Sequence, residues 1–467
     1  MSTQIPEKDP TSLSPEISTA QASPVASELS PTATHQPPAF TQYQLKASLD
    51  YDAHKVSVEQ EIDYTNNAGI PLTDLALVID ANRFPGALNL NTLTWQDGQA
   101  IADYRLDGIQ LTIPLLSPLP EGERISFSLA YQLTLPNQNE PFGYTERQTN
   151  LGDWYAFIPP YQVDEGWMVR EPAYLGEHLV YDIADFDVEI QLASPTSAEG
   201  RSLVIAASAP AEERGGIYHY NLARARSFAW SVSDQYQVLK TSVGDVEILS
   251  YSFPFHATAD EPALKATADA LAVYNRLYGP YAHKSLSVVE ADFLNGMEFE
   301  GLFFLSHAFY DYFTGTPENN LIIIAAHETA HQWFYGWVGN DQALEPWLDE
   351  ALSTYSESLF YESVYPDELD WWWQNRIYFH NPEGWVDTTI YQAAGFYPYR
   401  DAVYLRGTLF LKEIEDLIGR ETFMSFLVDY LNVYRYKIAS SDDFFALLKT
   451  HTSQDFSQIL DLYFESR

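Results

Sequence analysis

Residues 327–350 of the chain read HETAHQWFYGWVGNDQALEPWLDE and carry its most informative pattern. His327 and His331 are four residues apart, so on a helix their imidazoles project from one face and can bind one metal ion together. Glu350, after eighteen intervening residues, can supply a carboxylate from a second helix. Three such ligands leave a fourth position open for water, which is typical of a catalytic zinc site. Glu328, beside the first histidine, is placed to act as the general base for that water.

The residues around this pattern favour a metal site over a chance match. An apolar run over 321–326 leads into the histidines, and residues 332–334 continue the same helix with bulky side chains. A glycine-containing break ends at Pro346, and a second helical stretch over 347–357 can then present Glu350 inward. The alternative, two surface histidines with an unrelated acid, does not account for these flanks.

Composition narrows the class of protein and the chemistry of the site. A chain of 467 residues, 46% of them hydrophobic, predicts two or three domains. Its 65 acidic and 25 basic residues give a net charge of −40, which argues against nucleic acid and anionic membranes as partners. The chain has no cysteine, so its metal ligands must be His, Asp or Glu. It also has no apolar run near the roughly 18 residues that span a bilayer, so no transmembrane segment is expected.

The first 38 residues form a separate compositional segment. Nineteen of them are Pro, Ser or Thr, which predicts a disordered spacer over residues 1–38. Spacers of this kind often separate a domain from a cell-surface anchor. We therefore expect a cell-surface tether and an extracytoplasmic location, with an ordinary flexible terminus and a cytoplasmic location as the alternatives.

The next two hundred residues have the period of β-strands. Residues 43–49, 55–64, 124–135, 187–192 and 224–233 alternate or run as β-branched and aromatic stretches, with turn residues between them. This pattern predicts an antiparallel, sandwich-like β domain over residues 39–245.

The remaining residues have the period of helices. Residues 261–278 form an amphipathic helix that Gly279 and Pro280 stop, and 285–291 read as a strand. Further helices are expected over 401–418 and 442–449. The metal motif therefore lies in a helix-rich domain over residues 246–467, and the fold class is a multidomain α+β protein.

Three motifs resemble those of the gluzincin aminopeptidases, the family of aminopeptidase N and leukotriene hydrolase. The first is the His-Glu-x-x-His pattern with its eighteen-residue gap and Glu350 within Trp-Leu-Asp-Glu-Ala. The second, Asn-Gly-Met-Glu-Phe over 295–299, is similar to that family's Gly-Ala-Met-Glu-Asn motif and keeps Met297 and Glu298. The third, Tyr-Leu-Arg-Gly-Thr over 404–408, resembles the Tyr-x-Lys-Gly-Ala element that carries the family's catalytic tyrosine.

The resemblance implies a β domain followed by a thermolysin-like zinc peptidase domain, in a short form without the carboxy-terminal helical domain. It implies one Zn²⁺ per chain, peptide substrates and cleavage at the amino-terminal peptide bond. The implied roles are zinc ligands His327, His331 and Glu350; general base Glu328; oxyanion donor Tyr404; and a binding site for the substrate's amino end at Gly296, Met297 and Glu298.

Several of these assignments have rivals in the sequence. Tyr391, Tyr397 and Tyr399 compete with Tyr404, and Glu300 competes with Glu298. Glu357 lies two helical turns after Glu350, where it either accepts a hydrogen bond from a ligand histidine or faces solvent. Packing roles are expected for His307, His380 and the run Trp371-Trp372-Trp373, which could instead wall a substrate cleft.

Two other functions compete with that of a metallo-aminopeptidase. One is a thermolysin-like endopeptidase that uses the same zinc ion in an open cleft. The other is a catalytically silent surface protein that keeps a zinc-binding fold. The presence of base, ligands and tyrosine together argues against the silent protein.

Overall fold

The computed structural model describes residues 40–256 and 258–466. The spacer and the tether predicted for residues 1–38 lie outside the described residues. Among the described helices, none is long and apolar enough to cross a membrane.

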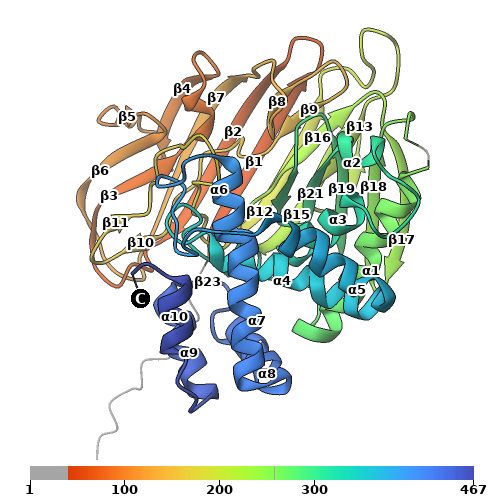
Figure 1. The fold of residues 1–467 in the computed structure, drawn as a ribbon. Helices are drawn as coiled ribbons and strands as arrows, with labels where there is room; N and C mark the ends of the chain where they lie inside the picture. The colour runs from red at the N-terminus through yellow and green to blue at the C-terminus, as the bar shows by residue number, and fades with distance from the viewer. Residues whose placement is uncertain (1–39, 257, 467) are drawn as a thin grey trace, which may run out of the picture. The chain divides into compact units, whose positions relative to one another are not determined.

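The first half is built on a seven-stranded sheet whose central strand β1 (Thr41–Asp50) buries every second side chain. In this strand, Tyr43, Leu45, Ala47 and Leu49 are buried while the residues between them face solvent. The sheet order is β14-β15-β12-β1-β2-β7-β4 (Figure 1). The other strands are β2 (Lys55–Thr65), β4 (Leu88–Trp95), β7 (Arg124–Thr134), β12 (Ala184–Leu192), β14 (Ala211–Arg214) and β15 (Ile217–Ala225). All neighbours are antiparallel except β1 and β12, which pair in parallel.

Two smaller sheets complete this half. One has the order β3-β6-β5 and the other β13-β16-β9-β8. Their strands are β3 (Leu72–Val78), β5 (Arg105–Asp107), β6 (Gln110–Leu119), β8 (Phe142–Tyr144), β9 (Thr149–Leu151), β13 (Val204–Ala207) and β16 (Trp230–Ser233). The inner faces of these sheets share one apolar core with the seven-stranded sheet.

The second half begins with a five-stranded sheet of order β17-β18-β19-β21-β20. It comprises β17 (Gln237–Val243), β18 (Val246–Ser252), β19 (Ser285–Ala291), β20 (Gly296–Phe299) and β21 (Leu302–Ser306). The boundary predicted at residue 245 falls in the turn between β17 and β18, which pair in this one sheet. The edge strand β20, antiparallel to β21, carries Met297 and Glu298.

Helices pack against this sheet and carry the metal motif. Helix α1 (Asp260–Tyr278) stops at Gly279, which has a φ of 110°, so the predicted helix and its end are confirmed. Helix α3 (Asn320–Ala330) begins where the Asn319 side chain accepts a hydrogen bond from the Leu321 amide. It contacts both α1 and α4 (Trp347–Val364), which lie together in Figure 1. The later helices are α7 (Gly407–Ile418), α8 (Arg420–Val433), α9 (Ser441–His451) and α10 (Ser457–Tyr463).

Large aromatic side chains fill the core between these helices. Trp333, Trp347 and Trp372 are fully buried, whereas Trp371 and Trp373 are half-buried against the same core. The tryptophan run therefore packs in the core, as predicted.

Candidate active site

Helices α3 and α4 bring the three predicted metal ligands together. His327 and His331 lie at the end of α3, Glu350 lies in the first turn of α4, and all three are buried. The Nε2 atoms of the two histidines are 3.1 Å apart. Glu350 Oε2 lies 3.2 Å from His327 Nε2 and 3.6 Å from His331 Nε2. The geometry therefore gathers two imidazoles and one carboxylate around a single point.

The outer nitrogens of the two imidazoles show that these residues fit a cation. His331 Nδ1 lies 3.1 Å from the carbonyl oxygen of Phe334, and His327 Nδ1 lies 2.8 Å from Glu357 Oε1. Both partners are acceptors, so each Nδ1 carries a hydrogen, and a ring that is neutral directs its Nε2 lone pair at the other ring. The two Nε2 lone pairs and the Glu350 carboxylate repel one another unless a positive ion binds between them. A nitrogen and oxygen donor set of this kind suits zinc.

The pKa values of the candidate ligands are shifted in opposite directions. Burial lowers the pKa of His327, but hydrogen bonds with Glu350 and Glu357 raise it to about 9. Burial raises the pKa of Glu350, but hydrogen bonds with His327 and His331 hold it well below its usual range. Because metal ligands must be deprotonated, a cation binding here competes with protons.

Glu357 is fully buried and orients the first histidine. In addition to His327, its carboxylate accepts hydrogen bonds from Arg376 Nε (2.9 Å), Arg376 Nη2 (2.8 Å) and Trp372 Nε1 (3.1 Å). The interpretation of Glu357 as a hydrogen-bond partner of a ligand histidine is confirmed, and the solvent-facing alternative is wrong.

Glu328 lies between the histidines and the edge strand β20. Its Oε2 atom is buried without a hydrogen-bond partner among the described residues. Burial raises the pKa of Glu328 to about 8, although His327 and His331 act in the opposite direction. A Cβ atom at Gly296 would lie 2.0 Å from Glu328 Oε1, so the glycine of β20 makes room for this carboxylate.

Tyr404 is the tyrosine closest to the candidate ligands. It lies in a π-helical turn, Asp401–Arg406, and its hydroxyl donates to Glu350 Oε1 at 2.6 Å. Burial raises the pKa of Tyr404 well above its usual value, so the phenol keeps its proton. Among the rivals, the hydroxyl of Tyr391 donates to the Glu171 carbonyl and Tyr397 is 67% exposed. Tyr399 is buried and its ring centre lies 5.9 Å from that of Tyr404.

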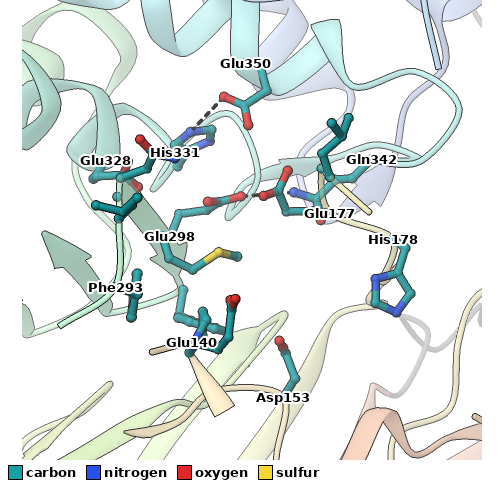
Figure 2. A pocket seen from close by; sticks show the side chains of 18 of the residues that line it. Glu140, Asp153, Glu177, His178, Phe293, Glu298, Glu328, His331, Gln342 and Glu350 are labelled. Carbon is teal, nitrogen blue, oxygen red and sulfur yellow. Dashed lines mark hydrogen bonds and ion pairs between the residues drawn. The ribbon is translucent and has the colours of Figure 1, made fainter. Parts of the chain in front are cut away.

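Glu298 projects from β20 toward the candidate ligands (Figure 2). It is buried, and burial raises its pKa. The competitor Glu300 is bound elsewhere: its carboxylate lies 2.7 Å from His283 Nε2 and accepts the Arg226 amide at 2.6 Å. The two acids are thus distinguished by what their side chains contact.

The structure adds an acid that the sequence pattern did not indicate. Glu177 lies near Glu298 (Figure 2), and its pKa is raised well above the usual value by burial and then by the charge of Glu298. Among the described residues, no Lys or Arg forms an ion pair with Glu177 or Glu298. Glu177 belongs to a segment without helix or strand, so no periodicity or motif in the sequence could have indicated it.

A cavity of about 970 Å³ opens onto the three candidate ligands and onto Glu328, Tyr404, Glu298 and Glu177. Its wall includes residues of the β half and of the helical half, among them Arg83, Glu140, Asp153, Glu177, His178, Met297, Glu298, His327, Glu328, His331, Glu350, Tyr399 and Tyr404. His307, expected to pack, also lines this cavity, whereas His380 instead contacts Arg400 at 3.1 Å.

Comparisons with known proteins agree with this geometry. Residues 262–463 match the model of the peptidase family M1 domain. Aminopeptidase M1-D of Oryza sativa subsp. japonica is 26% identical over 206 residues, which are 40% of this chain and 23% of that protein. Endoplasmic reticulum aminopeptidase 2 of Bos taurus is 27% identical over 230 residues, 46% of this chain and 24% of that protein. The match thus spans about a quarter of the length of these curated relatives.

The fold matches a solved structure over nearly its whole length. The M1 zinc metallopeptidase from Deinococcus radiodurans superposes with a TM-score of 0.66 at 19% identity, over 91% of this chain and 93% of that chain. A mainly β half followed by a helical half, as predicted, is therefore confirmed. The fold and the site define a metallopeptidase-type architecture. Residues 262–463 therefore carry a peptidase family M1 domain, and the resemblance to the gluzincin aminopeptidases is confirmed.

Proposed function

We propose that the protein is a zinc-dependent aminopeptidase that hydrolyses the amino-terminal peptide bond of peptides. The observation that carries this proposal is one cavity in which three converging ligand atoms lie next to an unpartnered buried carboxylate, Glu328. The same cavity holds two further acids, Glu298 and Glu177, which are suited to a cationic substrate group.

One Zn²⁺ per chain would be held by His327, His331 and Glu350. When bound, the ion would supply Lewis-acid activation of water and of the substrate carbonyl. Glu328 would take a proton from the attacking water and pass it to the leaving amine. Tyr404 would donate its phenolic hydrogen to the negative charge that develops on the carbonyl oxygen.

Glu298 and Glu177 would bind the substrate's α-ammonium group. A charge-assisted contact to that group is one that an internal peptide bond cannot offer, so it restricts cleavage to the first residue. Gly296 and Met297, on the same strand as Glu298, would line the site for that residue. The predicted domain limits 39–245 and 246–467 stay a proposal.

A paired assay tests this function. Aminoacyl amides and peptides with free amino termini should be hydrolysed, their N-acetylated counterparts should not, and a chelator should abolish the activity until zinc is restored. Comparable cleavage of both sets would support the endopeptidase alternative. Zinc binding without hydrolysis of any peptide would support the silent protein.

Removing the charge of Glu298 should reduce selectivity for free amines. We expect Glu298→Gln to lower kcat/KM on free-amine substrates about 10–100-fold, the value of a hydrogen bond to a charged group. Residual hydrolysis of N-acetylated peptides should change little, because they lack the ammonium group. The measurement is the ratio of the two kcat/KM values, and an equal loss on both substrates would contradict the role.

Weakening the hydrogen bond between His327 and Glu357 should reduce zinc affinity. We expect Glu357→Gln to weaken zinc binding about 10–100-fold, because a ligand histidine loses its anionic hydrogen-bond partner. Competition with a chelator measures the affinity. Trp372→Phe is the matched control, because it removes a 3.1 Å hydrogen bond to Glu357 Oε2 but leaves the His327 contact in place. Equal affinities for the Glu357 variant and the wild type would refute this role.

A further inference from the structure

The loop between the two ligand-bearing helices carries a buried amide, Gln342. This side chain is 5% exposed and lines the cavity. Its Nε2 atom donates to Glu298 Oε1 at 3.1 Å and to Asp349 Oδ2 at 2.9 Å. One amide group therefore bridges the first turn of α4 and the edge strand β20, whose Glu298 lies beside Gln342 in Figure 2.

The partner in α4 connects this bridge to the candidate metal ligands. Asp349 is buried, directly precedes Glu350, and accepts the Glu350 amide on its other oxygen at 2.9 Å. Gln342 thus ties the carboxylate proposed to bind the substrate's amino group to the helical turn that holds a candidate zinc ligand.

The loop itself is anchored, so Gln342 is a fixed point. Asp341 Oδ1 accepts the backbone amides of Ala343 at 3.2 Å and Leu344 at 3.1 Å. Asp341 Oδ2 accepts Nε of Arg170, which comes from the β half, at 2.8 Å. The Ala343 carbonyl in turn accepts the Ile390 amide at 3.0 Å.

Glu298 needs such a fixed point because several acids lie near it. Glu177, Glu350 and Asp349 act on its charge or on one another's, whereas His331 and His327 act on Glu298 in the opposite direction. Among the described residues, Gln342 Nε2 is the only side-chain donor to the Glu298 carboxylate. Without that donor, repulsion would favour rotamers that turn the carboxylate away from its neighbours.

We propose that Gln342 is a positioning residue that holds the Glu298 carboxylate at a set distance from the metal-binding helix, and so fixes where the substrate's α-ammonium binds relative to the scissile bond. This inference rests on the proposed aminopeptidase function. In this role Gln342 determines which peptide bond is cleaved. It acts by positioning Glu298 and does not contact the reacting atoms.

Two zinc-binding probes separate this role from a structural one. Leucine hydroxamate carries both a metal-binding group and an α-amine, whereas acetohydroxamate carries the metal-binding group alone. We expect Gln342→Leu to raise the inhibition constant of leucine hydroxamate about 10–100-fold, from the loss of a hydrogen bond to a charged group. The inhibition constant of acetohydroxamate and the zinc content should stay near those of the wild type.

A double-mutant cycle locates the effect. In a Glu298→Gln background, Gln342→Leu should cause almost no further loss of leucine hydroxamate binding, because the positioned group is already gone. Additive losses would overturn the proposal. Gln342→Asn, which is one methylene shorter, should give the same selective loss if the leucine variant is too unstable to assay.

A buried glutamine that supports the same strand is the matched control. Gln332 Nε2 donates to the Phe299 carbonyl at 3.0 Å, and Gln332 Oε1 accepts the Gly301 amide at 2.9 Å. Gln332→Leu should reduce stability without changing the ratio of the two inhibition constants. If the wild type itself does not prefer the amine-bearing probe, the proposed function fails. If the wild type does and Gln342→Leu keeps that preference, only this inference fails.

Discussion

Glu328→Gln is expected to retain one zinc ion per chain and to lose about a thousandfold in kcat. The substitution keeps the shape of the side chain but removes the proton acceptor, and general-base catalysis typically contributes about 10²–10⁴-fold. The buried, unpartnered Oε2 of Glu328 beside the three ligand atoms is the reason for expecting an effect well above the lower end of that range. Peptide hydrolysis and zinc content measured on the same sample check the prediction.

The role of Glu328 as general base also predicts the acid limb of the pH–rate profile. A general base acts when deprotonated, so activity should rise as pH increases through the pKa of Glu328. Burial raises this pKa to about 8, and a bound divalent ion would lower it again. The Glu328→Gln variant should lose this acid limb from its residual activity.

The control for this experiment is the same substitution at a buried acid outside the cavity. Glu300→Gln changes a carboxylate that contacts His283 and the Arg226 amide and does not line the cavity. It should leave kcat within a small factor of the wild type. Near-normal turnover of Glu328→Gln would refute the assignment of the base.

Local sequence patterns were sufficient where a structure depends on neighbours along the chain. The alternation in 43–49 predicted a strand that lies within β1, and the spacing in 261–278 predicted α1 to within one residue. The spacing of His327, His331 and Glu350 predicted three groups that do converge. In each case the periodicity of one or two elements determines which side chains share a face.

The sequence was insufficient where placement depends on tertiary contacts. Residues 224–233 were predicted as one strand, but β15 ends at Ala225 and β16 begins at Trp230. The chain turns there because Arg226 is buried and its guanidinium donates to the carbonyls of Tyr181, Tyr335 and Lys437. The parallel pairing of β1 with β12 joins Thr41 to Ala184, a separation that no local pattern encodes.

The same limit explains the missed parts of the site. Glu177 lies in an irregular segment, and Gln342 lies in a loop whose conformation depends on Arg170 from the β half. Each is positioned by contacts with residues far away in the sequence. The motifs thus predicted the groups proposed for chemistry, whereas the groups that surround them became visible only in three dimensions.

Tyr404→Phe is expected to lower kcat about 10²–10³-fold, the usual loss when one donor to a developing oxyanion is removed. The phenol keeps its proton because burial raises its pKa well above the usual value, so it can donate at neutral pH. Its 2.6 Å hydrogen bond to Glu350 Oε1 places the hydroxyl beside the ligand set. The variant keeps all three candidate ligands, so zinc content should change far less than turnover.

Tyr399→Phe is the matched comparison for this experiment, because Tyr399 is buried, lines the same cavity and lies five residues away. The two hydroxyls differ in their contacts: among the described residues, the Tyr399 hydroxyl has no hydrogen-bond partner, whereas that of Tyr404 donates to a candidate ligand. The Tyr399 variant should keep most of its kcat. Each substitution removes one hydroxyl and keeps the ring. A steep loss in Tyr399→Phe with normal turnover in Tyr404→Phe would transfer the oxyanion role to Tyr399. Equal losses would indicate a packing effect common to both rings.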